Sequence, residues 1–168
     1  MHQLRSHVFG AVSALLAQFP VGFVFIALPL ISSDYPFLRL AELIGVYWFA
    51  TALVAAPIII FLGIPVFHLL RRKGLDNYKS LAMSGAAIAA VISAVLLWPI
   101  ESAGYSSGGN YYGTYRNMIV DGSPTLWGWI RFVEDIVMFA VHGAIGGIAF
   151  RYGWQKAVQS AVAETTCD

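Results

Sequence analysis

The side chains with the greatest potential for chemistry lie in or beside the last apolar stretch of the sequence. Arg131, Asp135 and His142 are spaced so that a helix would present them on one face. Because histidine changes charge near neutral pH, a face with an Arg131–Asp135 pair above a buried His142 would suit a proton or ion path. A neutral His142 that hydrogen-bonds a neighbouring helix is the favoured alternative, because the cores of the other apolar stretches hold no Asp, Glu, Lys or Arg to continue a path.

A second group of candidate residues is a set of tyrosines in the polar segment 101–128, which is rich in glycine and serine. Tyrosine in such surroundings provides contact area at a low cost in conformational entropy, as it does in adaptable binding surfaces. The other interpretation is a flexible glycine-rich loop whose tyrosines lie at the lipid headgroups. The candidate binding loop contains Tyr105, Tyr111, Tyr112 and Tyr115.

The sequence lacks the patterns that would indicate catalysis or a bound metal. It has no P-loop, no HExxH helix and no GxSxG nucleophile elbow. A single cysteine excludes a disulfide framework and a thiolate zinc site. The net charge of +1 provides no basic surface for nucleic acid. We therefore expect no enzyme, with no catalytic residue, cofactor or metal and no nucleic-acid partner.

The elements that must position these residues follow from the composition, which is 58% hydrophobic and 11% charged. A soluble domain carries about 25% charged residues, so the sequence predicts an integral membrane protein in contact with the lipid bilayer. A helix that crosses the hydrocarbon core needs about 20 apolar residues. The apolar stretches predict four spans, at 8–31, 43–70, 80–100 and 129–151, with a kink at Pro57 in the second.

The distribution of charge predicts the orientation of these spans. Seven of the ten lysines and arginines fall on one side, whereas six of the nine acidic residues fall on the other. The seven are Arg5 before the first span, Arg71, Arg72, Lys73 and Lys79 in the loop 71–79, and Arg151 and Lys156 at the C-terminal tail. Because basic residues are retained on the cytoplasmic side, we expect both termini inside and the loop 101–128 outside. The expected fold is all-α: a polytopic four-transmembrane-helix bundle that forms one membrane domain over residues 1–168.

Small residues predict how the helices pack, because in lipid they allow backbones to approach closely. The third span holds most of them, so we expect it to be the central helix of the bundle. The fourth span carries two glycines at GxxxG spacing. We expect packing within the chain, with a homo-oligomer as the alternative, through Gly85, Ala89, Gly143 and Gly147.

Two segments carry a resemblance to small, uncharacterised four-span bacterial inner-membrane proteins. The first is Gly63-Ile-Pro-Val-Phe-His-Leu-Leu-Arg-Arg-Lys-Gly74, followed by small residues from Ser84 to Ala90. The second, His142-Gly-Ala-Ile-Gly-Gly147 followed by Ala149 and Phe150, is similar to their last helix. Some four-span proteins of this size are immunity proteins against pore-forming colicins or secreted membrane toxins. The resemblance implies a multi-pass location in the bacterial inner (cytoplasmic) membrane.

The expected function is therefore protein–protein binding in or at the membrane, without catalysis. The partner would be a toxin or a larger membrane complex, and the protein would act as an immunity or accessory protein. The alternative is a small transporter or channel component that uses the polar face of Arg131, Asp135 and His142.

Overall fold

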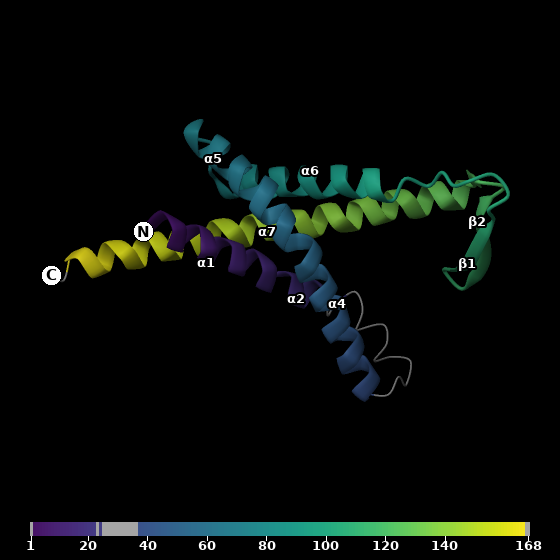
Figure 1. Cartoon of the computed structure of the whole chain (residues 1–168), viewed down its shortest axis with the longest axis horizontal. Coiled ribbons are helices and arrows are strands. Elements are labelled where there is room, and N and C mark those ends of the chain that lie inside the picture. Colours follow the sequence, from purple (N-terminus) through teal and green to yellow (C-terminus); the bar gives the residue numbers. More distant parts are fainter. Residues whose placement is uncertain (1, 23, 25–36, 167–168) are drawn as a thin grey trace.

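The computed structural model describes residues 2–22, 24 and 37–166, which are mostly helical (76%) and include one small sheet. Figure 1 shows the elements in chain order. They are α1 (His2–Leu16), α2 (Gln18–Gly22), α4 (Phe37–Ile58), the π-helical segment η2 (Ile59–Gly63), α5 (Ile64–Arg72), α6 (Tyr78–Leu96), β1 (Ser107–Tyr111), β2 (Thr114–Val120), β3 (Ser123–Pro124) and α7 (Leu126–Thr166).

Three helical stretches of the described chain are long and apolar enough to cross a membrane. They are Ala41–Arg72 with 32 residues, Tyr78–Leu96 with 19 and Leu126–Ala163 with 38. They coincide with the second, third and fourth expected spans. The first expected span, 8–31, begins in α1 and α2, and residues 23 and 25–31 of it lie outside the described residues. The described chain therefore has the apolar helices of a membrane protein.

Two of the helices differ from the expected spans at prolines, and the last helix is longer than expected. α6 ends at Leu96, three residues before Pro99, because a residue that precedes proline is disfavoured in the helical conformation. Pro57 lies inside α4, and the π-helical turns of η2 begin two residues later. Proline lacks a backbone N–H and crowds the preceding turn, and a wider π-helical turn is one way in which a helix continues past such a site. α7 is continuous for 41 residues, so much of the expected tail 152–168 is helical.

The expectation of an all-α fold is wrong in the segment 101–125, which forms a three-stranded antiparallel sheet in the order β1-β2-β3. Tyr111 pairs with Thr114, which leaves a two-residue turn of Tyr112 and Gly113. Both turn residues have positive φ, 49° and 79°, as a type I′ hairpin turn requires. The sequences that usually mark this turn are Asn-Gly, Asp-Gly and Gly-Gly. Because the turn here is Tyr-Gly, the sequence carries no clear hairpin signal.

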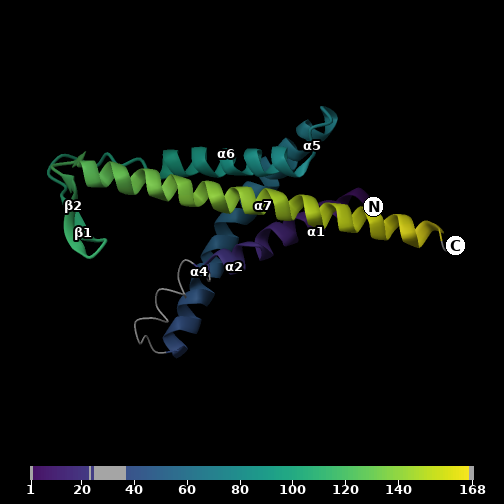
Figure 2. The ribbon, with the colours of Figure 1, turned by 180° about the vertical axis from the view of Figure 1, so that it is seen from behind.

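The centre of the fold is α7 rather than the third span, α6. α7 contacts α1, α2, α6, β2 and β3, and Figures 1 and 2 show α6 side by side with it from both directions. The two helices run antiparallel: Tyr78 at the start of α6 hydrogen-bonds Gln155, whereas Trp98 beyond its end packs on Phe132. The long α7 thus offers packing surface to several elements, whereas α6 uses its small residues mainly against α7.

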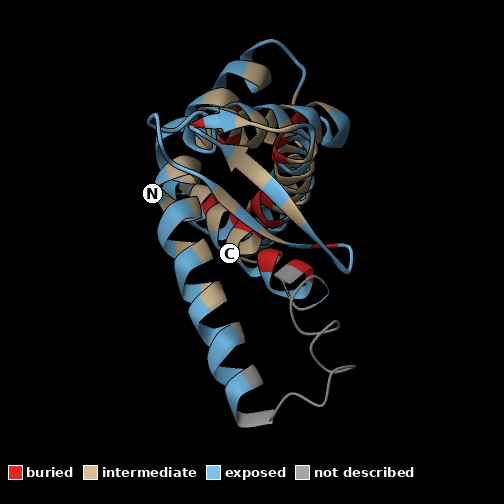
Figure 3. Ribbon diagram, turned by 90° about the vertical axis from the view of Figure 1, so that its right-hand side faces the viewer, coloured by how far each residue is buried: buried red, intermediate tan, exposed pale blue. Residues whose placement is uncertain are grey.

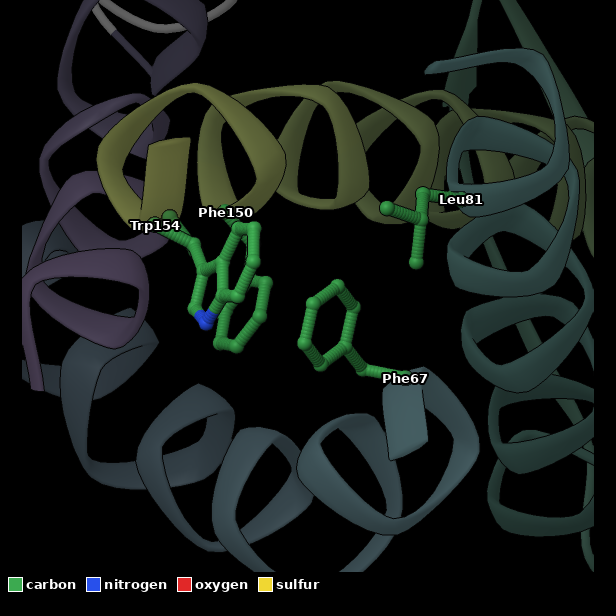
Figure 4. Packing of buried hydrophobic residues seen from close by; sticks show 5 residues of the cluster. Phe67, Leu81, Phe150 and Trp154 are labelled. Carbon is green, nitrogen blue, oxygen red and sulfur yellow. The ribbon is translucent and has the colours of Figure 1, made fainter. Parts of the chain in front are cut away.

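The apolar core lies toward the end of α7 that is far from the sheet. Phe67 of α5 is fully buried there, and its ring lies 5.2 Å from that of Phe150 and 5.3 Å from that of Trp154 (Figure 4). Leu81 and Ala14 complete this cluster. Elsewhere the buried residues are few and scattered, and none of the described residues of α4 is buried (Figure 3). Such a surface is typical of helices that contact lipid.

Candidate functional site

The tyrosines of the hairpin β1–β2 are attached to α7 through one carboxylate. The Tyr111 hydroxyl donates a hydrogen bond of 2.5 Å to Glu134 Oε2, and the Tyr112 hydroxyl donates one of 3.0 Å to Glu134 Oε1. Glu134 lies on the outer part of α7, and both of its oxygens are therefore occupied by the hairpin. The Tyr111 ring is buried and packs edge-on against Trp127, with 5.8 Å between centroids. We call this arrangement of Tyr111, Tyr112 and Glu134 the tyrosine clamp.

The clamp also changes the acidity of its tyrosines. Burial, followed by the hydrogen bond to Glu134 and the negative charge of that side chain, raises the pKa of Tyr111 to about 12. The hydrogen bond to Glu134 is the main cause of the raised pKa of Tyr112. Both hydroxyls therefore remain neutral donors at physiological pH.

The base of the sheet is fixed to the start of α7 by further contacts. The Thr125 hydroxyl donates a hydrogen bond of 2.6 Å to the carbonyl oxygen of Asn117 in β2. It also accepts a hydrogen bond of 3.2 Å from the Gly128 N–H, so it caps the first turn of α7 and joins that turn to β2. The Arg116 guanidinium lies over the Trp127 ring at 4.4 Å. The sheet is therefore held to α7 at its base and at its hairpin turn, and it is not the flexible loop that glycine content suggested.

The four candidate tyrosines divide into two kinds. Tyr111 is buried and serves the attachment of the hairpin, whereas Tyr112 and Tyr115 are 84% and 69% exposed. Tyr105 is exposed at the start of the same segment. The structure thus brings together a buried anchor, Tyr111, and exposed aromatic side chains, Tyr112 and Tyr115, on one hairpin.

The predicted polar face of α7 has separate partners at its two ends. Arg131 Nε lies 3.1 Å from Asp135 Oδ2, which is the expected ion pair. His142 lies deeper, where Nδ1 is 2.8 Å from the Met138 carbonyl oxygen and Nε2 is 3.0 Å from the Tyr47 hydroxyl. Because a carbonyl oxygen only accepts, Nδ1 carries a proton, and Nε2 is hydrogen-bonded to the Tyr47 hydroxyl. These two contacts bind His142 to its own helix and to α4.

The four predicted packing residues lie together where α6 meets α7. A Cβ atom added to Gly85 would overlap the carbonyl oxygen of Gly143, and one added to Gly147 would overlap that of Leu81. A Cβ atom on Gly143 would lie 2.7 Å from the Cβ of Ala89. The two backbones are therefore in direct contact, and this surface is occupied within the chain.

Three residues that make tertiary hydrogen bonds are not indicated by the sequence pattern: Glu134, Tyr47 and Gln18. Nothing in the sequence around Glu134 indicates that a hairpin returns to it. Tyr47 lies in the second expected span, and nothing local indicates that it bonds His142. The sequence does give a reason to examine Gln18. An amide inside an apolar stretch costs free energy to bury, so it needs hydrogen-bond partners.

Within the described residues no group of three or more His, Cys, Asp or Glu side chains is placed to hold a metal ion. The tyrosine clamp attaches the hairpin to α7, and the His142 contacts join α7 to α4. Comparison of the chain with protein families, with curated proteins and with solved structures finds no match.

Proposed function

We propose that this protein crosses a bacterial inner membrane with four helices and binds a protein partner through the exposed tyrosines of its hairpin. In this arrangement both termini lie inside and the sheet lies outside. An immunity or accessory protein is the role that this arrangement suits. The observation that carries the proposal is the tyrosine clamp, because Glu134 fixes the hairpin that presents Tyr112 and Tyr115.

A fixed hairpin favours binding for an entropic reason. Ordering a flexible loop on association opposes binding, and a loop that is already ordered avoids most of that loss. Exposed tyrosines add contact area with little loss of rotamer freedom. The hairpin also has β1 at one edge of the sheet, where an extended peptide segment of a partner can pair with the backbone. These features fit a protein partner better than a lipid headgroup.

The binding proposal is tested by comparing tyrosine-to-alanine changes on the hairpin and on the second half of α7. We expect Tyr112→Ala with Tyr115→Ala to weaken partner binding about 30-fold, as loss of an aromatic hot spot does. The matched control is Tyr152→Ala, because Tyr152 is also exposed but lies in the second half of α7, away from the hairpin. The measurement is co-purification from membranes followed by titration of the captured partner. Equal binding by the double variant and the control would rule out the hairpin as the surface.

The proposed orientation is tested by labelling single cysteines. After Cys167→Ser, cysteine is introduced at Ser106 beside β1 or at Ser160 near the end of α7, both of which are exposed. We expect a membrane-impermeant maleimide to label position 106 in intact cells and position 160 only after lysis. Labelling of position 160 in intact cells would contradict the proposed topology.

The transporter or channel alternative has one observation in its favour: His142 borders a partly open cavity between the helices. On that alternative, Asp135→Asn and His142→Ala would each lower transport, because the ion pair and the imidazole would lie on the path. If both variants keep full activity while hairpin substitutions abolish it, the alternative fails and the binding proposal stands.

A further inference from the structure

A cavity of about 620 Å³ lies among the helices, bordered by α1, α2, α4, η2, α5, α6 and α7. Its volume falls within the range of about 300–1,000 Å³ that is typical of small-molecule sites. The lining side chains are almost all apolar, and none of them is Asp, Glu, Lys or Arg. The cavity therefore suits a molecule that is largely apolar and carries no charge, because a buried charge without a counter-ion is strongly disfavoured.

One polar side chain in the lining has an acceptor without a donor. Gln18 is only 6% exposed, and its Nε2 donates to the carbonyl oxygens of Ala14 at 3.2 Å and His142 at 3.3 Å. Because both partners only accept, the amide nitrogen must face them and the amide cannot be flipped. Gln18 Oε1 is buried and receives no hydrogen bond from any residue in the described part of the chain. An acceptor left in this state costs free energy that a ligand with a donor would recover.

Two other polar side chains of the lining have hydrogen-bond partners within the described residues. The Ser84 hydroxyl donates to the Leu81 carbonyl oxygen at 3.1 Å, and the Tyr47 hydroxyl is hydrogen-bonded to His142 Nε2 at 3.0 Å. The buried acceptor that lacks a donor from any described residue is Gln18 Oε1. A ligand that satisfies this acceptor must supply a hydrogen-bond donor.

We propose that this cavity binds a neutral apolar molecule with a hydroxyl group, which donates to Gln18 Oε1 while the hydrocarbon part lies against the apolar wall. This inference is independent of the hairpin and its partner. Two classes of membrane molecule share the required chemistry: lipid alcohols such as diacylglycerols, and reduced quinones.

The test uses photocrosslinking of the full-length protein in phosphatidylcholine vesicles. One probe is a hexadecanol that carries a diazirine in its chain, and the other is its methyl ether, which has the same chain but no donor. In the wild-type protein we expect the alcohol to bind about tenfold more tightly than the ether, with crosslinks on peptides of the lining. In Gln18→Leu, which keeps an apolar wall, we expect the ratio to fall to about one.

A pair of neighbouring alanines in α4 provides the steric control. Ala55 lines the cavity and Ala56 does not, so Ala55→Phe should abolish crosslinking of both probes while Ala56→Phe leaves it unchanged. Equal binding of alcohol and ether by the wild-type protein would overturn the proposal, and so would full binding by Ala55→Phe. The wild-type comparison needs no variant, so it decides the question even if Gln18→Leu fails to fold.

Competition then identifies the source of the natural ligand. Displacement of the alcohol probe by dioleoylglycerol supports a lipid alcohol, and displacement by ubiquinol but not ubiquinone supports a reduced quinone. If neither hydroxyl compound displaces the probe, the proposed ligand chemistry is wrong.

Discussion

The contact between α6 and α7 makes a quantitative prediction for the substitution Gly147→Ala. An added Cβ atom would overlap the Leu81 carbonyl oxygen and lie 2.8 Å from the Leu81 carbonyl carbon and 3.3 Å from the Ala82 nitrogen. All three obstacles are backbone atoms, so no change of rotamer relieves the overlap and the helices must separate.

The magnitude follows from two opposing terms. Overpacking of a close contact costs about 1–3 kcal/mol, and the upper end applies because the obstacle is backbone. Replacing a helical glycine with alanine returns about 1 kcal/mol through helix propensity. We therefore expect the free energy of unfolding to fall by about 2 kcal/mol. The matched control is Gly45→Ala in α4, where an added Cβ atom meets nothing within 4 Å, and which should gain about 1 kcal/mol.

The assay is unfolding of the detergent-solubilised protein by sodium dodecyl sulfate, followed by far-ultraviolet circular dichroism. A difference of about 3 kcal/mol between Gly147→Ala and Gly45→Ala is expected from the two estimates above. If both variants unfold at the same detergent fraction, the backbones of α6 and α7 are not in contact and the packing described here is refuted.

Three further predictions concern the sheet and the opposite end of α7. Tyr111 should ionise near pH 12 in an absorbance titration, and because burial and Glu134 together raise its pKa, Glu134→Gln should lower that midpoint toward 10. Since the fold favours the neutral hydroxyl, this contribution to stability is complete below pH 10 and is lost between about pH 10 and pH 12. Asp76→Asn removes the partly buried ion pair with Arg151, whose atoms are 3.0 Å apart, and should lower the free energy of unfolding by about 1 kcal/mol in the same detergent assay. Gly122→Ala should destabilise the sheet by about 1–2 kcal/mol, because φ is +74° there; hydrogen exchange of β2 and β3 measures it.

Each of these predictions has a result that contradicts it. An unchanged Tyr111 midpoint in Glu134→Gln would show that the clamp does not form. The Arg151–Asp76 ion pair would be contradicted if Asp76→Asn had the same free energy of unfolding as the wild-type protein in both low and high salt. Salt screens such pairs, so a real pair should give a difference that is larger in low salt. For Gly122→Ala, the telling result is hydrogen exchange as slow as in the wild-type protein, which would exclude the left-handed turn.

The apolar helices could be predicted from the sequence because their signal is local. Runs of uncharged residues place 43–70, 80–100 and 129–151 close to where the structure has helices. Small residues in the third span indicated Gly85, and glycine spacing in the fourth indicated Gly143 and Gly147, which lie at one contact. Both signals depend on composition within a single segment, which the sequence shows directly.

The sheet and the polar contacts could not be predicted in the same way because they join distant residues. Tyr111 meets Glu134 only after β1 and β2 have formed, and His142 meets Tyr47 from another helix. The turn at Tyr112 and Gly113 lacks the usual Asn-Gly signal. The polar partners of a buried amide such as Gln18 likewise depend on which helices become neighbours.

The length of α7 has a structural consequence. A continuous helix of 41 residues is roughly 60 Å long, about twice the thickness of the hydrocarbon core of a bilayer. The tyrosine clamp is fixed near one end of this rod, and the Phe67–Trp154 cluster is fixed toward the other. The clamp and the buried aromatic cluster are therefore joined by uninterrupted helical backbone, with no loop between them.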